Sequence, residues 1–273
     1  MIVAGLVLLV VGAADLVRQF VERRWIGYLV VAAAALVIGG LTDAVLPAVA
    51  ALAAGAGWVW SMPDRGESRM AFWPAVALGA ITAAAVLWLG DRGPAGVLGG
   101  VWRLDTPFGE VSADLALLVL GVVAFLLESG NVVVRAALAG EHAWHPAEVG
   151  FAGPTAASEP STPRPESSAP GSEPSASASA VPPPAAVPAP LTGGFKGGRL
   201  IGPLERLIVF LLTLATAYSL LAAMLAAKGI VRFPEISRDG ETGARAEYFL
   251  VGSLVSWVIA LAAAFLVWWS VNA

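Results

Sequence analysis

Residues 113–138 read ADLALLVLGVVAFLLESGNVVVRAAL, and this stretch decides the fold. Its apolar run is long enough to cross the ~30 Å hydrocarbon core of a bilayer as a helix. Glu128, Asn131 and Arg135 follow one another at spacings of three and four residues, so they share one helix face. If the helix starts near Leu115, Glu128 lies about 20 Å along it. An ionisable group at that depth is costly, and it is by default a functional candidate that faces protein or water.

An alternative interpretation ends this helix at Glu128. Asn131 and Arg135 would then lie on a short helix at the membrane interface. The sequence leaves both interpretations open.

The composition of the whole chain favours a polytopic membrane protein. Of its 273 residues 58% are hydrophobic and 13% are charged, whereas about a quarter of a soluble domain is charged. The chain has no cysteine, which excludes disulfides and thiolate chemistry, and its net charge of −4 gives no reason to expect nucleic-acid binding. Arginine dominates the basic residues, and Ala and Gly are abundant. This bias is typical of a GC-rich bacterial genome, so we expect a bacterial plasma membrane.

The order of apolar and polar segments predicts an all-α protein with about seven spans. A five-helix bundle is expected in 1–142, a disordered linker in 143–197 and a two-helix membrane hairpin in 198–273. The linker is predicted from Pro, Ala and Ser enrichment, since 12 of the 19 prolines lie in 146–190.

Residues 25–60 are too long for one span and suit two short ones. The break is expected at Gly39–Asp43, where Thr42 or Asp43 would cap the second helix. A single span over 25–60 is the alternative. In the next span, residues 71–90, the small residues Ala75, Gly79 and Ala83 predict a seam for close helix contact.

Lys and Arg counts predict the orientation of the chain. With seven spans, ten basic residues fall on one side and six on the other. The richer side is predicted to be cytoplasmic. The N-terminus would then lie outside, and the linker and C-terminus inside. The first segment lacks a signal-peptide pattern, so we expect a retained helix.

Small residues predict how the two C-terminal spans, 207–227 and 248–270, pack together. Each span carries a stripe of small residues at four-residue spacing. If Lys228 and Glu247 lie at one membrane surface, the two stripes match in register and Ser219 lies opposite Ser256. The stripes are Ala215, Ser219, Ala223 and Ala227 on one helix, and Gly252, Ser256, Ala260 and Ala264 on the other.

The last 75 or so residues also resemble a known family. The pattern IGPLERLIVFLL…LLAAMLAAKGIVRF…AEYFLVGSLVSW is similar to the C-terminal membrane segment of an uncharacterised bacterial integral-membrane family, a domain of unknown function. The resemblance implies no mechanism, but it does imply that the charged residues form a unit. It is carried by Ile201, Gly202, Leu204, Glu205, Arg206, Ala227, Lys228, Arg232, Phe233, Glu247, Tyr248, Gly252 and Ser256.

The segment GRLIGPLERLIVF, residues 198–210, places Glu205 and Arg206 beside each other at the start of a span. Pro203 and Glu205 suit the first turn of a helix, and Arg206 can snorkel to lipid headgroups. Alternatively, Arg206 pairs with Glu128, or Glu205 with Arg135, which would attach the C-terminal hairpin to the bundle.

The remaining charged groups give weaker indications of a function. Lys228 and Arg232, one helical turn apart, need an anion nearby, which Glu235, Glu247 or a lipid phosphate would supply. Asp15 and Arg18 are interpreted as a solvated helix end.

The two histidines lie in EHAWHPAE, residues 141–148, which we interpret as solvated surface rather than a metal site. No catalytic arrangement stands out, and we expect no enzyme activity and no cofactor.

Three function classes follow. The first is a non-enzymatic scaffold, assembly or regulatory membrane protein, whose partners are the bilayer and another membrane protein or a second copy. The second is a small-solute transporter or channel component that uses Glu128. The third is a membrane-embedded enzyme or sensor for an anionic lipid headgroup that uses Lys228, Arg232 and Glu247.

Overall fold

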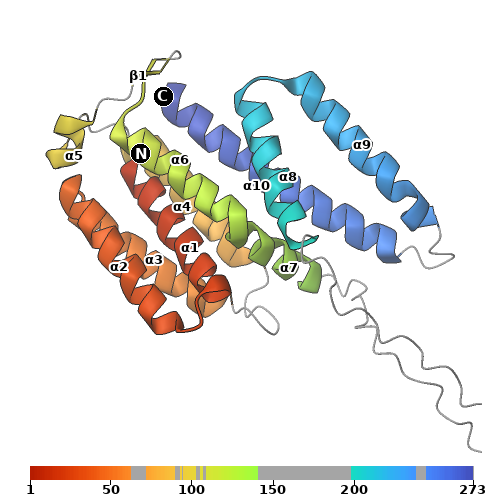
Figure 1. Cartoon of the computed structure of the whole chain (residues 1–273), viewed down its shortest axis with the longest axis horizontal. Coiled ribbons are helices and arrows are strands. Elements are labelled where there is room, and N and C mark those ends of the chain that lie inside the picture. The colour runs from red at the N-terminus through yellow and green to blue at the C-terminus, as the bar shows by residue number, and fades with distance from the viewer. Residues whose placement is uncertain are drawn as a thin grey trace, which may run out of the picture. The chain divides into compact units, whose positions relative to one another are not determined.

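The computed structural model describes residues 1–62, 72–89, 93, 95–102, 105–106, 109–140, 198–237 and 244–272, and these form a helical unit (Figure 1). Two short strands, β1 (Asp105–Thr106) and β2 (Gly109–Glu110), pair antiparallel. The helices are α1 (Ile2–Phe20), α2 (Arg24–Leu41), α3 (Val45–Ser61), α4 (Trp73–Leu89), α5 (Gly96–Val101), α6 (Ala113–Ala124), η1 (Phe125–Ser129), α7 (Gly130–Gly140), α8 (Gly198–Leu214), α9 (Tyr218–Ser237) and α10 (Ala244–Asn272).

Within the described residues, four helices are long and apolar enough to cross a membrane. They are Ile2–Phe20, Arg24–Leu41, Ala113–Leu138 and Phe249–Asn272. Ala113–Leu138 combines α6, η1 and α7, so the predicted helix does continue past Glu128. Shorter apolar helices cover Val45–Ser61, Trp73–Leu89 and Tyr218–Ile230. The expectation of an all-α protein with membrane-spanning helices is confirmed at this level.

The predicted break inside 25–60 is confirmed, because α2 ends at Leu41 and α3 starts at Val45. The capping differs from the prediction. Thr42 Oγ1 donates to the carbonyl oxygen of Ile38 at 2.7 Å, so this hydroxyl closes α2 instead of starting α3. Asp43 then takes a positive φ of 52°, which turns the chain back along α2.

Helix α1 lies at the centre of the N-terminal half and contacts α2, α3, α4, α6 and η1. It runs parallel to α6, with Gly5 against Leu118 and Gly12 against Ala124. A Cβ added at Gly12 would lie 2.5 Å from the carbonyl carbon of Ala124, and one at Gly121 would lie 2.5 Å from the carbonyl oxygen of Gly5. The two backbones therefore approach each other directly, which only glycine permits here.

The prediction of one continuous helix over 207–227 is wrong. Helix α8 ends at Leu214 and α9 starts at Tyr218. Thr216 takes a positive φ of 54° in the turn between them. Backbone amides of the turn find hydrogen-bond acceptors at the end of α8. The amide of Ala217 donates to the Leu212 carbonyl at 2.9 Å, and that of Ala215 donates to the Leu211 carbonyl at 2.9 Å.

The predicted packing between the two small-residue stripes is wrong for the same reason. Ala215, Ser219, Ala223 and Ala227 are all exposed, so Ser219 does not face Ser256. On α10, by contrast, Ser256, Ala260 and Ala264 are buried. Helix α10 packs mainly against α8 and α7. The turn at Thr216 directs α9 away from the stripe, so α8 and not α9 is the partner that precedes α10 in the sequence.

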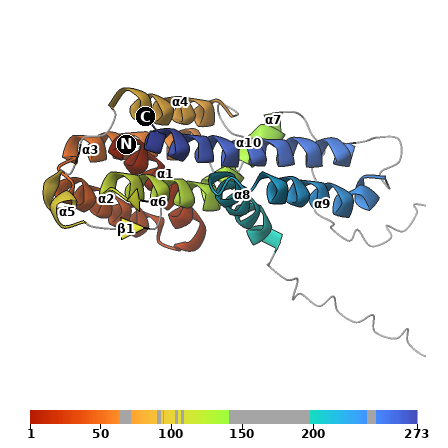
Figure 2. The ribbon, with the colours of Figure 1, turned by 90° about the horizontal axis from the view of Figure 1, so that it is seen from above.

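Helix α10 runs antiparallel to α7. A Cβ at Gly252 would lie 3.6 Å from Leu138 and 3.8 Å from Val134. Seen from above, α4 lies on one side of α10, and α8 and α9 lie on the other (Figure 2). The start of α1 and the end of α10 lie at the same end of the helical unit (Figure 1).

We expect Gly12→Ala to destabilise the protein by about 1–3 kcal/mol, because the new methyl group overpacks the contact between α1 and α6. The matched control is Gly57→Ala on α3, where a Cβ meets no atom within 4 Å. Thermal unfolding of both variants in detergent measures the effect. An equal melting temperature for the two variants would show that the close approach is not needed.

Candidate functional site

Arg206 on α8 is the largest side chain that is fully buried among the described residues, with 2% of it exposed. Its guanidinium donates to three acceptors from other helices. Nε donates to the Leu126 carbonyl at 3.0 Å, and the two terminal nitrogens donate to Asn131 Oδ1 at 2.6 Å and to Ser256 Oγ at 3.5 Å. The side chain therefore joins α8 to η1, α7 and α10.

A π-helical turn prepares this contact. η1 covers Phe125–Ser129, and its Leu126 carbonyl is the acceptor for Arg206 Nε. π-turns disturb the regular hydrogen-bond ladder of a helix and occur frequently at functional sites. Gly130 then leaves room for the arginine, since a Cβ at this position would lie 2.6 Å from Arg206 Nε.

Asn131 connects the arginine to the buried acid. While its Oδ1 accepts from Arg206, its Nδ2 donates to Glu128 Oε2 at 3.3 Å. Glu128 is 6% exposed, so its carboxylate lies inside the protein. The structure thus brings Glu128 and Asn131, which precede the predicted linker in the sequence, together with Arg206, which follows it. Ser256 of the α10 stripe joins the same cluster.

Glu205 takes part in a neighbouring cluster instead of pairing with Arg135. Its Oε1 accepts from Lys228 Nζ at 2.5 Å and from Trp257 Nε1 at 2.8 Å. The ammonium of Lys228 also lies over the rings of Phe249 and Trp257, at 5.5 and 5.3 Å from their centroids. Such cation–π contacts stabilise a cation that is removed from water. Lys228 therefore finds its anion within the protein.

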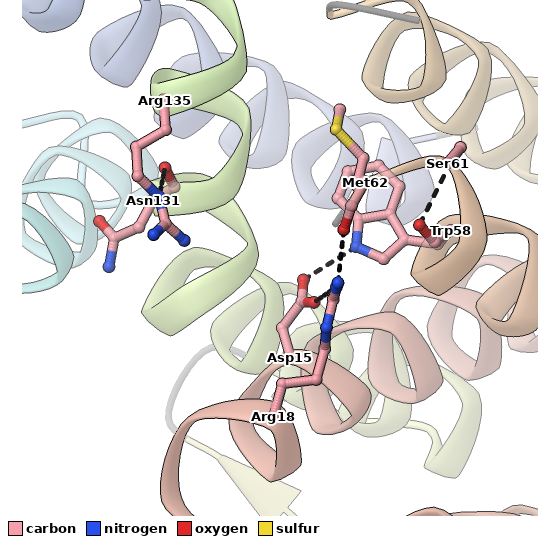
Figure 3. A network of polar contacts seen from close by, with 7 residues as sticks. All are labelled: Asp15, Arg18, Trp58, Ser61, Met62, Asn131 and Arg135. Atoms are coloured by element: carbon pink, nitrogen blue, oxygen red, sulfur yellow. Dashed lines mark hydrogen bonds and ion pairs between the residues drawn. The ribbon is translucent and has the colours of Figure 1, made fainter. Parts of the chain in front are cut away.

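The other predicted site residues lie outside these two clusters. Arg135 is exposed and donates from Nε to the Asn131 carbonyl at 3.4 Å (Figure 3). Glu247 is exposed. The side chain of Arg232 lies outside the described residues, as do Glu235 and the histidine segment 141–148. Within the part that is described, no group of three or more His, Cys, Asp and Glu side chains could hold a metal ion.

A second buried network, which the sequence did not predict, lies at the end of α1 (Figure 3). Asp15 and Arg18 form an ion pair at 2.9 Å and are only 2% and 8% exposed, so the interpretation as a solvated helix end is wrong. Trp58 Nε1 donates to Asp15 Oδ2 at 2.9 Å, and Arg18 donates to the Met62 carbonyl at 2.5 Å. The network holds the end of α3 against the end of α1.

Comparison with family models, with curated proteins and with solved structures finds no match for this chain. The interpretation of the site therefore rests on its own geometry. Its buried polar groups donate to and accept from one another, and they connect helices that are far apart in the sequence. This arrangement is suited to holding helices in one relative position.

We expect Trp58→Phe to lower the free energy of unfolding by about 1.5–3 kcal/mol, because it removes one donor from the buried Asp15 carboxylate. The edge contact of this ring with Phe125, at 6.1 Å between centroids, is largely kept by phenylalanine. Thermal unfolding in detergent is the measurement, with Trp88→Phe as the control because Trp88 is 86% exposed. The network would have no structural role if both variants melted alike.

Proposed function

We propose that this protein is a multi-pass membrane protein of the bacterial plasma membrane that acts as a non-enzymatic scaffold, assembly or regulatory component. The single observation that carries the proposal is the burial of Arg206 between the two halves of the chain. Its three donating nitrogens are all directed at protein acceptors. Leaving a buried hydrogen-bonding group without its partner costs about 1–3 kcal/mol, and more when the group is charged, so the contact favours one arrangement of the helices.

The long segment between the halves supports this role. Residues 141–197 separate α7 from α8, yet α8 and α10 pack on η1 and α7. Sequence rich in proline, serine and alanine is typical of disordered linkers that are partly extended as polyproline II helix. In the proposed function, the arginine contact keeps the membrane helices together, and the linker remains available to a partner protein.

We further propose that α8 and α9 form a re-entrant pair that enters and leaves the membrane on the linker side. Arg206 lies level with Leu126, and Leu214 is about 12 Å further along α8. Helix α6 continues about 20 Å from Leu126 to Ala113, so the tip of the pair ends well before the far surface. The hydrogen-bonded turn at Ala215–Ala217 suits this position, since unpaired backbone groups are costly in hydrocarbon.

The basic residues support this topology more strongly than the seven-span arrangement. With α1, α2, α3, α4, α6–α7 and α10 as full crossings, Arg92 and Arg103 fall on the side of the chain termini, and Arg206 and Lys228 fall within the re-entrant pair. The positive-inside rule then predicts a cytoplasmic linker and both termini outside. The other twelve of the sixteen basic residues fall on the linker side: Arg18, Arg23, Arg24, Arg65, Arg69, Arg135, Arg164, Lys196, Arg199, Arg232, Arg238 and Arg245.

A transporter component is the second candidate, and the position of Glu128 favours it. Glu128 is a buried carboxylate within the π-turn of a membrane helix, and buried intramembrane acids mark ion and proton pathways, while π-turns occur frequently at functional sites. An apolar cavity between α4 and α10 does not support this function, because the described residues that line it do not include Glu128, Asn131 or Arg206. Uptake of solute by vesicles that requires Glu128 would favour the transporter.

We expect Arg206→Ala to release the C-terminal helices from the bundle. A protease site inserted into the linker of the full-length chain, near residue 170, allows the halves to be separated after folding. The wild-type halves should co-purify after cleavage, and those of Arg206→Ala should separate. Arg135→Ala is the control, because it removes an exposed arginine nearby. Co-purification of the Arg206→Ala halves would contradict the proposed contact.

The same variants test the function itself. Affinity capture from native membranes should recover a stable protein partner with wild type and Arg135→Ala, and several-fold less of it with Arg206→Ala. A scaffold is contradicted if wild type recovers no protein partner.

The absence of cysteine makes the topology directly measurable with single-cysteine variants. A membrane-impermeant maleimide should label Ala273→Cys and Gly100→Cys in intact cells, because both lie on the outer side in the proposed topology. Ser68→Cys and Ser172→Cys should react only after the cells are lysed. If Ala273→Cys were not labelled in intact cells, the result would indicate a cytoplasmic C-terminus, as the seven-span arrangement requires, and would contradict the proposed topology.

A further inference from the structure

A cavity of about 540 Å³ lies between α4 and α10 and reaches inward to α1 and the α6–η1–α7 helix. Its volume is within the range of small-ligand pockets. None of the described residues that line it is charged. The one hydroxyl among them, on Thr82, donates to the carbonyl oxygens of Leu78 and Gly79, both at 3.0 Å. The walls therefore offer a ligand almost nothing but apolar contact.

Small residues on α4 create the space. Ala75, Gly79 and Ala83 border the cavity, so this stripe does not form the helix seam that its spacing predicts. A Cβ at Gly79 would meet no atom within 4 Å. On the opposite wall, α10 contributes larger side chains, among them Ile259, Leu266 and Trp269.

The length of the cavity is close to the thickness of one leaflet of a bilayer. Its wall extends about 15 Å along α10, from Ile259 to Trp269, and about 18 Å along α4, from Ala75 to Leu87, whereas half of the ~30 Å hydrocarbon core is about 15 Å. Trp269 belongs to an aromatic group with Phe265 and Trp268, with ring centroids 5.7 to 6.5 Å apart. Tryptophans of this kind mark the membrane–water interface. The cavity thus runs from the interface at the end of α10 toward the middle of the membrane.

We propose that this cavity binds one acyl chain of a membrane lipid, from the leaflet at the C-terminal end of α10. An apolar cavity does not hold water well, and an empty one loses the dispersion contacts of its walls. An acyl chain supplies those contacts over the full length, and its headgroup remains at the interface beside Trp269.

The experiment uses the full-length protein in phosphatidylcholine vesicles that contain a phosphatidylcholine with a diazirine on its acyl chain. After photolysis, mass spectrometry of peptides maps the cross-links. We expect at least threefold more cross-linking to the cavity walls on α4 and α10 than to the exposed face of α3.

Ala83→Phe fills the cavity, and it should reduce the cavity cross-links at least fivefold. The matched control is Ala53→Phe, at an exposed position of α3, and it should leave them unchanged. If Ala83→Phe fails to fold, Gly79→Leu is the second filling variant. Uniform cross-linking, or cavity cross-links that persist in a folded filling variant, would overturn the proposal. Disulfide-linked dimers of Gly79→Cys would overturn it in favour of a second copy of this chain.

Discussion

A buried guanidinium is the constraint on which the C-terminal half of the structure depends. An arginine removed from water is costly unless its donors find acceptors, and the acceptors of Arg206 come from η1, α7 and α10. Hydrogen bonds from a charged donor are stronger than neutral ones, so they restrict the orientation of each helix that supplies an acceptor. The position of α8 also decides that of α9 through the turn at Thr216. One side chain thereby connects the arrangement of five elements: η1, α7, α8, α9 and α10.

The N-terminal half contacts the same stretch, at η1, through apolar packing instead of hydrogen bonds. Gly12 of α1 packs directly on the backbone of Ala124 and Phe125, at the junction of α6 and η1. The next turn of that helix carries the Leu126 carbonyl and Gly130, which receive Arg206. The same short stretch is therefore held on one face by apolar packing and on another by hydrogen bonds. This explains how the two halves of the chain form one helical unit across a long connection.

The spacing of residues along single helices predicted part of the site, and among the long-range contacts only the approach of Arg206 to Glu128 was considered. The shared face of Glu128 and Asn131 follows from a three-residue spacing, and Arg206 could be proposed as a partner because it begins a span with few other charges. The burial of Asp15 could not be predicted, because its partner Trp58 is 43 residues away and no local pattern connects them. The π-turn was not predicted either, because its sequence, FLLES, contains no glycine or proline that would indicate a departure from an α-helix.

The turn at Thr216 shows how much of the fold can depend on a local feature that composition does not reveal. The segment LLTLATAYSL contains no glycine or proline, so its pattern predicts a continuous helix. With the turn, Glu205 lies ten residues before Ala215 and Lys228 eleven residues after Ala217, so a hairpin brings the two charges to the same level. Their contact at 2.5 Å then needs no lipid phosphate. The proposed re-entrant pair also sends the basic residues after Lys228 back to the linker side. The local turn thus accounts for the charge pair and, in the proposed topology, for the asymmetric distribution of arginine.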